Sequence, residues 1–298
     1  MAINMKFYGF DYLVNEHQRI FWLYIFSSML ITAIYIYIFD TKKREIFSKN
    51  IWLHKSAKLD YMYFFLSSIV KAILLSPLII GTGAVASWTL VQMQNYIGYV
   101  EFIHLNRNVI ILLYTLLVFL VSDFTRYLLH RLMHNVKFLW KFHKVHHSAE
   151  VLNPLTFYRV HFVENILFSI RYALSIGLLS GIFLYFFGAR VGIIDILGVN
   201  IFVFIFSLIG SNLRHSHVQI RFGKKIEKWI ISPYMHQYHH SIDGLNKNFG
   251  GSLAIWDRVF KTLHNEKSKS LKFGIKDESR YRTILSLFIQ PFKELQNG

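Results

Sequence analysis

The sequence predicts an all-α fold, in which a polytopic bundle of about four to five transmembrane helices carries a cytoplasmic, histidine-rich helical cap. Hydrophobic residues make up 53% of the 298 residues and charged residues only 17%, whereas an average soluble domain is about 25% charged. The apolar residues gather in runs of the length that a bilayer requires, about 20 residues. The chain also has 15 histidines, and several of them form short clusters at the ends of these runs.

Five apolar runs are candidates for the spans. They cover residues 20–39, 61–80, 109–129, 165–187 and 193–210. The first begins after about 18 residues and lacks a small-residue cleavage site, so we expect a retained span rather than a removed signal. The second contains Lys71, and residues 61–92 are compatible with one span, two spans or a hairpin.

Lys and Arg are distributed unequally between the loops. Six lie between the first two runs, five between the third and fourth, and fifteen after Gly210, whereas the opposite side holds four. The positive-inside rule places the basic side in the cytoplasm, with the N-terminus outside and the C-terminus inside. The same rule accounts for the formal net charge of +16, so no nucleic-acid partner is expected.

Three histidine clusters carry the candidate chemistry. They are an HxxxH at 130–134, an HxxHH at 143–147 and a second HxxHH at 236–240. On a helix, positions i, i+3 and i+4 share a face, so each cluster can direct two or three imidazoles toward one point. The chain has no cysteine, which excludes thiolate ligands, and neutral imidazole suits Fe, Zn, Cu and Ni. Eight ligands exceed the need of one ion, so we expect two metal ions bound by His130, His134, His143, His146, His147, His236, His239 and His240.

The predicted topology places all three clusters on the cytoplasmic side, where they can converge. A single HxxxH pair can arise by chance, and a haem-binding bundle would carry single histidines in mid-span. Further candidate ligands are His215 and His217, just after the fifth run, and His161, just before the fourth. The isolated histidines, which we expect at the surface or the membrane interface, are His17, His54, His104 and His264.

At these residues the chain resembles the fatty acid hydroxylase/sterol desaturase superfamily of integral membrane di-iron enzymes. The resemblance covers about residues 123–264 and rests on the segments 129–134, 139–148, 153–161, 215–217, 236–240, 248–250 and 256–260. Two positions depart from the usual pattern, because His217 stands where the family has Asn and Lys261 stands where it usually has Gly. Lys261 lies outside the expected ligands.

The resemblance implies a transmembrane bundle with a cytosolic histidine-rich cap, and it implies iron, dioxygen and an external electron donor. Its members hydroxylate, desaturate or oxidatively cleave sterols, fatty acyl chains, ether lipids and carotenoids, so it indicates the chemistry better than the substrate. We therefore predict a membrane-bound, O2-dependent oxidoreductase that hydroxylates or desaturates a lipid. Two iron ions are the expected cofactors, with zinc as a substitute in recombinant protein. The expected partners are a lipid from the bilayer and an electron-transfer protein with its reductase.

The chain is expected to divide into N-terminal spans and loops (1–108), a fatty acid hydroxylase-like catalytic domain (109–264) and a cytoplasmic tail (265–298). Histidine ligands usually donate their second ring N–H to an acceptor, and the candidate acceptors are Asp123, Glu150, Asn153, Asn246 and Asp257.

Two other classes of function remain as alternatives. A metal-transport or metal-storage membrane protein would carry ionisable ligands inside its spans, and here the clusters lie outside them. A zinc hydrolase would need one ion and usually an HExxH motif, which the chain lacks.

Overall fold

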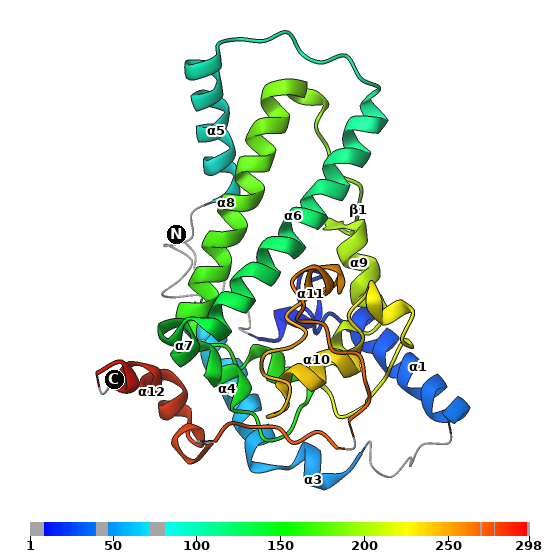
Figure 1. The fold of residues 1–298 in the computed structure, drawn as a ribbon, viewed down its shortest axis with the longest axis vertical. Helices are drawn as coiled ribbons and strands as arrows, with labels where there is room; N and C mark the ends of the chain where they lie inside the picture. Colours follow the sequence, from blue (N-terminus) through cyan, green and yellow to red (C-terminus); the bar gives the residue numbers. More distant parts are fainter. Residues whose placement is uncertain (1–8, 40–46, 72–80, 269, 277, 297–298) are drawn as a thin grey trace.

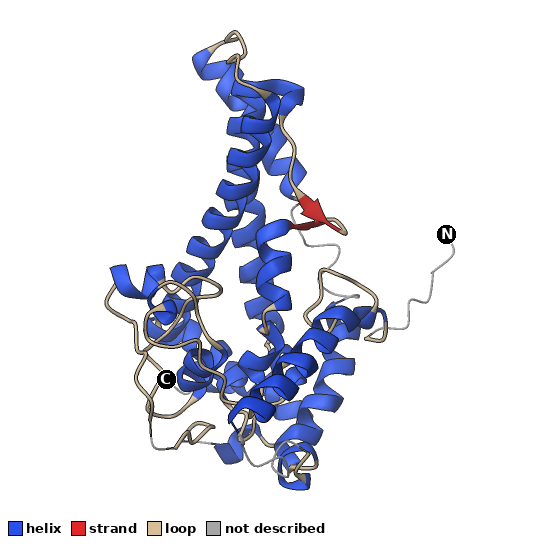
Figure 2. Cartoon of the chain, turned by 90° about the vertical axis from the view of Figure 1, so that its right-hand side faces the viewer, coloured by secondary structure: helices blue, strands red, loops and turns tan. Residues whose placement is uncertain are grey.

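The computed structural model describes residues 9–39, 47–71, 81–268, 270–276 and 278–296. The described chain is mostly helical, as predicted, and Figure 2 shows helices throughout with one small pair of strands. In Figure 1 the helices α5, α6 and α8 form the upper part of the molecule, and shorter helices and loops gather beneath them. The fold is therefore a helical bundle continued by an irregular, helix-rich cap.

Three described helices are long and apolar enough to cross a membrane. They are α1 (Trp22–Phe39), α6 (Arg107–Asn135) and α8 (Phe162–Phe187), the last extended to Arg190 by the single turn η5 (Gly188–Arg190). At 1.5 Å per residue, the 29 residues of α6 measure roughly 44 Å, which exceeds the hydrocarbon thickness of about 30 Å. A helix of this length that crosses a bilayer extends beyond its core, and the last turns of α6 carry His130 and His134.

The second predicted run begins within one helix and ends before the next described helix. Helix α4 (Lys55–Val70) begins six residues before that run, and α5 (Thr82–Ile97) follows it. Residues 72–80, where the run was expected to continue, lie outside the described residues.

Close packing of α5 against α8 depends on two glycines of α8. A Cβ atom on Gly177 would lie 2.5 Å from Val85 Cβ, and one on Gly181 would lie 2.4 Å from Thr89 Cβ. Small residues let two helix backbones approach closely, which is a common basis of helix association in membranes. The pairs also show that α5 and α8 run parallel, because both positions advance together along the chain.

The predicted span over residues 193–210 is wrong as a single helix. Strands β1 (Asp195–Ile196) and β2 (Val199–Asn200) pair antiparallel, and Leu197 and Gly198 between them have positive φ angles of 52° and 77°. Only α9 (Ile201–Leu208) is helical, starting where the Asn200 side chain accepts a hydrogen bond from Phe202 N. Its eight residues measure about 12 Å, less than half of the hydrocarbon core. Turn and capping residues interrupt a segment that is apolar enough to look like a span.

The cap is built from short elements around the lower ends of α6 and α8. These are η1 (Asp11–Leu13), α3 (Lys49–Trp52), α7 (Lys137–His147), η4 (Pro154–Tyr158), η6 (Ser211–His215), η7 (Ile226–Lys228), α10 (Pro233–His240), α11 (Ile255–Val259), η8 (Glu278–Tyr281) and α12 (Ile284–Gln296). A buried apolar cluster formed by Leu59, Tyr63, Val145, Ile275, Tyr281 and Leu287 joins α4 and α7 to the C-terminal segment.

A buried ion pair fixes α4 to the loop before α8. Arg159 Nε lies 2.5 Å from Asp60 Oδ1, and both side chains are at most 1% exposed. The same carboxylate accepts hydrogen bonds from Asn153 Nδ2 at 2.9 Å and Thr156 Oγ1 at 2.7 Å, and Arg159 also donates to Ser56 O at 2.7 Å. This network fixes residues 153–159, which follow the 143–147 cluster, against α4.

Candidate metal centre

Nine histidines from four segments meet inside the cap. Helix α6 contributes His130 and His134 from its last turns, and η6 contributes His215. Helix α7 contributes His143, His146 and His147, and α10 contributes His236, His239 and His240. All are buried except His134, which is partly buried. The three sequence clusters therefore converge as predicted.

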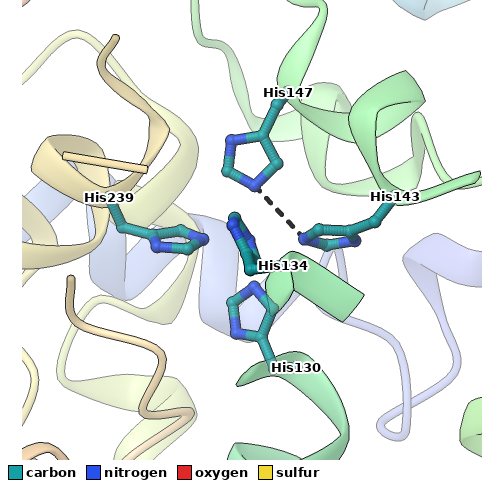
Figure 3. A group of neighbouring side chains, drawn as sticks. All are labelled: His130, His134, His143, His147 and His239. Atoms are coloured by element: carbon teal, nitrogen blue, oxygen red, sulfur yellow. Dashed lines mark hydrogen bonds between the residues drawn. The ribbon is translucent and has the colours of Figure 1, made fainter. Parts of the chain in front are cut away.

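The first group consists of His130, His134, His143, His147 and His239. One ring nitrogen of each lies within 4.8 Å of the others. Figure 3 shows the five rings directed toward a common point, and the Nε2 atoms of His143 and His147 are 3.2 Å apart. We refer to these residues as group one.

The second group, group two, consists of His146, His215, His236 and His240, whose ligand atoms also lie within 4.8 Å of one another. His215 Nε2 is 3.2 Å from the Nε2 atoms of both His146 and His236, and His236 Nε2 is 3.2 Å from that of His240. The arrangement directs Nε2 of all four rings toward a shared centre.

The two groups interleave along the helices that supply them. His143 and His147, four residues apart, serve group one, whereas His146 serves group two; on α10, His236 and His240 serve group two and His239 serves group one. Residues four apart share a helix face, so each helix presents one face to each group. The groups adjoin where the His147 and His240 rings stack, with centroids 4.5 Å apart.

The donor atoms fit cations. Imidazoles bound to one ion at about 2.1 Å place their nitrogens roughly 3.0–3.4 Å apart, and the observed spacings are 3.2 Å. His134 Nε2 and His239 Nε2 are buried without a hydrogen-bond partner among the described residues. Burial, followed by the positive charge that neighbouring histidines would carry, holds the pKa values of His146, His215 and His236 well below the usual range. Neutral imidazole is the form that binds metal.

Backbone carbonyls orient several of these rings. Where Nδ1 donates to a carbonyl, Nε2 is left free to face a metal. The donor–acceptor pairs are His130 Nδ1 to Phe249 O at 2.8 Å, His146 Nδ1 to Arg159 O at 3.2 Å and His239 Nδ1 to Lys247 O at 2.7 Å.

One carboxylate approaches a cluster histidine, and the sequence reasoning missed it. Glu164 Oε1 lies 3.0 Å from His143 Nδ1, and both residues are at most 3% exposed. The sequence feature that could have indicated this contact is the position of Glu164, an acidic residue directly before the apolar run of residues 165–187.

The five acceptors expected from the sequence make no hydrogen bond to a cluster histidine in the described structure. Asp123 accepts from Ser252 N, Leu253 N and Trp256 Nε1. Asp257 accepts from Phe249 N and Gly250 N, and thus acts indirectly on the carbonyl that orients His130. Asn153 binds Asp60 and caps η4, Glu150 pairs with Arg282, and Asn246 lines a separate surface cavity.

Of the three additional candidate ligands, one lies in a histidine group and two lie outside both groups. His215 belongs to group two. His161 lies outside both groups, because its Nδ1 accepts from Val163 N at the start of α8 and its Nε2 donates to Phe288 O at 3.1 Å. His217 also lies outside them, with its ring against Trp52.

A cavity of about 220 Å³ opens beside the histidines. Its lining includes members of both groups, the aromatic rings of Phe157 and Phe168, and four arginines from four parts of the chain. The cavity provides space for a reacting group next to both sets of imidazoles.

Comparison with known proteins confirms the resemblance. Residues 115–262 match the family described as fatty acid hydroxylase. The chain is 32% identical over 176 residues to ornithine lipid hydroxylase OlsE of Rhizobium tropici, covering 58% of this chain and 48% of the relative. It is 30% identical over 159 residues to alkylglycerol monooxygenase of Xenopus tropicalis, covering 52% and 31%, and 28% identical over 153 residues to the human enzyme of that name, covering 51% and 31%. The matched region thus spans at most about half the length of these relatives, and no solved structure matches.

Proposed function

We propose that this chain, whose residues 115–262 belong to the fatty acid hydroxylase family, is a membrane-bound, O2-dependent oxidoreductase that hydroxylates a C–H bond of a lipid. The observation that carries the proposal is the division of nine inward-facing histidines into two adjoining groups of five and four. Two relatives named as a lipid hydroxylase and an alkylglycerol monooxygenase support the reaction type.

Iron is the proposed metal, one ion held by each group. Imidazole accepts several transition metals, and aliphatic C–H bonds resist acid–base attack, so a redox-active metal pair would supply the activation of dioxygen. Zinc, which binds the same donors, would replace iron in part when the protein is overproduced. The overall reaction consumes O2, two electrons and two protons, and yields the alcohol and water.

The protein's own residues hold and shield the site. The carbonyls of Phe249, Arg159 and Lys247 fix ring orientations, and burial of the imidazoles keeps them neutral and keeps bulk water away. The substrate would enter the 220 Å³ cavity from the membrane side, between α6 and α8, which both line it.

The two electrons require an external carrier and its reductase, which are also proposed partners. The Trp140 ring lies with its centroid 5.0 Å from that of His134 and 5.6 Å from that of His147. Trp140 also lines a surface cavity of about 450 Å³ together with Lys144, Lys247 and Lys276. Asp243 also lines this cavity and Lys144 pairs with Glu294, so the local excess of positive charge rests on Lys247 and Lys276. This excess next to group one supports docking of an acidic carrier.

The segments keep their expected roles in the proposal. Residues 1–108 supply N-terminal membrane helices, 109–264 the catalytic domain, and 265–298 a tail that packs on the cap. The excess of Lys and Arg on the cap side supports a cytoplasmic active site.

A non-catalytic metal-binding or metal-transport protein is the second candidate. It would explain the histidines, but the cavity and the relatives' names favour catalysis.

Metal content and lipid oxidation test the two candidates together. Protein purified from iron-replete cells should contain about two metal ions per chain by elemental analysis. Cells grown under ¹⁸O2 should contain a lipid with one ¹⁸O atom, which is absent when the His146→Ala/His239→Ala double variant replaces the wild type. One metal ion or none in folded protein would refute the two-ion site. Two ions without any oxidised lipid would favour the transport candidate.

A further inference from the structure

Four arginines from distant parts of the chain surround the cavity beside the histidines. Arg19 precedes α1, Arg126 lies in α6, Arg171 in α8 and Arg214 in η6, and all four line the 220 Å³ cavity. All four also line a second cavity of about 330 Å³. They therefore stand at the boundary between the two chambers, and we call them the arginine cage.

None of the four forms an ion pair with a carboxylate of the described chain. Arg19 donates to Ser211 O at 3.3 Å, and Arg171 donates to Ser122 O and Thr125 Oγ1 at 2.9 Å. Arg214 donates to Gly251 O. These partners are neutral, so they satisfy some N–H donors without balancing the positive charge.

Several donors of the cage have no acceptor among the described residues. Arg171 Nε is buried without a hydrogen-bond partner. Arg126 makes no hydrogen bond to the described residues, and its guanidinium lies 5.6 Å from the centroid of the Phe168 ring. Guanidinium groups recognise carboxylate and phosphate through paired N–H donors, so these free donors are suited to an anion.

Two carboxylates, Glu164 and Asp123, line the chambers together with the arginines. Glu164 lies against His143. Asp123 accepts three hydrogen bonds from the 252–256 segment. The lining therefore carries four guanidiniums against two carboxylates, which leaves an excess of positive charge. The pKa of Arg19 lies well below the usual range. Burial is the first cause, and repulsion by the charges of Arg214 and Arg126 is the second.

The second chamber leads away from the histidines along the helical bundle. Its apolar lining includes Val118 and Phe119 of α6, Tyr172 of α8 and Val203 of α9. Histidines of both groups line only the first chamber of this pair. A molecule that fills both would thus place a polar group at the cage and a hydrocarbon chain among the helices.

We propose that the arginine cage binds the anionic group, phosphate or carboxylate, of a lipid substrate, and that the carbon oxidised lies close to this head group rather than near the end of the hydrocarbon chain. The inference rests on the proposed function, since it assigns the substrate class of the same site. An ionisable group within a membrane protein normally has a functional partner, and here the lipid supplies it.

Lipid binding by the full-length, metal-loaded protein tests the cage. The protein in an uncharged detergent is titrated with phosphatidylglycerol, with a free fatty acid and with a diacylglycerol of matched chains, and bound lipid is counted by native mass spectrometry. We expect phosphatidylglycerol or the fatty acid to bind at least about tenfold more tightly than the diacylglycerol, because the diacylglycerol has no anionic group to form a charge-assisted hydrogen bond with the guanidiniums. Preference for the first identifies phosphate and for the second carboxylate.

Variants locate the binding. Arg126→Gln should weaken anionic-lipid binding about tenfold or more, and Arg126→Lys should retain part of it. Arg19→Gln, on a different segment, provides the same test if the first variant does not fold. Arg107→Gln is the matched control, because it removes the same charge from the exposed end of the same helix and should leave binding unchanged.

Equal binding of the diacylglycerol would overturn the proposal, as would unchanged binding in the Arg126→Gln and Arg19→Gln variants or an equal loss in Arg107→Gln. Metal content is measured on the same samples. Anion-selective binding by a protein that holds fewer than two metal ions would uphold the cage and refute the two-metal function, so the two failures are distinguishable.

Discussion

Glu164 and His143 form a close contact at the junction of the membrane bundle and the cap, with Oε1 of the first 3.0 Å from Nδ1 of the second. Glu164 lies in the first turn of α8, and His143 lies on the face of α7 that serves group one. A carboxylate behind an imidazole orients the ring and increases its basicity as a ligand. This contact therefore couples the start of α8 to the histidines of group one.

Removing the charge of Glu164 should weaken group one. We expect Glu164→Gln to reduce metal affinity or lipid hydroxylation by about 10–100-fold, and Glu164→Leu to reduce it further because no acceptor remains. Metal retained after dialysis against a chelator measures the effect. Glu150→Gln is the control, since its partner is the exposed Arg282. Equal metal retention in both Glu164 variants and wild type would contradict the role.

Single substitutions should separate the two groups. His239→Ala removes a nitrogen from group one and His146→Ala removes one from group two. Each should lower the metal content from about two to about one and reduce hydroxylation by at least about 10–100-fold, as loss of a ligand exceeds loss of its hydrogen-bond partner. Elemental analysis and product formation are the readouts, and His104→Ala in an exposed loop is the control. Full activity in either variant would remove that histidine from the site.

The Asp60–Arg159 pair should be important for stability. Asp60→Ala leaves the Arg159 charge buried without its partner, which typically costs about 3–5 kcal/mol. Thermal unfolding in detergent should shift clearly downward, with Asp243→Ala at an exposed position as the comparison. An unchanged melting temperature would show that the pair contributes no net stability.

Acid should destabilise the cap through His161. Burial lowers the pKa of this residue to about 4, whereas an unfolded histidine titrates near 6.5. Below about pH 6.5 the unfolded chain binds a proton that the folded chain does not, so this contribution to stability is complete above that pH and is lost as the pH falls toward 4. His161→Asn keeps a helix-capping side chain and should show a shallower loss of melting temperature between pH 7 and 5. Equal slopes would count against this assignment.

The orientation can be tested by reporters. A fusion after Gly298 and an insertion near Lys43 should both report the cytoplasm if the basic loops face inward. An external signal from either would overturn the cytoplasmic site.

The histidine clusters were predictable because helical spacing and the short side chain restrict where each ring can point. The assignment of His146 and His239 to the opposite group from their neighbours was not predictable, since it depends on how α7 and α10 face each other. Glu164 was missed because the contact joins residues of two different helices. The 193–210 run was predicted wrongly because hydropathy averages over Gly198, which lies in the turn between the two strands, and Asn200, which caps the start of α9.

The interleaving of the two groups has a consequence for biogenesis. Neither group can be completed from one half of the chain, because group one needs His239 beside residues 130–147 and group two needs His146 beside residues 215–240. During synthesis, therefore, neither group can be assembled until α10 has been synthesised and packs next to α6 and α7. Metal binding to such a site is coupled to folding. Loading of the cofactor would therefore be the last event of maturation and would signal that membrane insertion has been completed correctly.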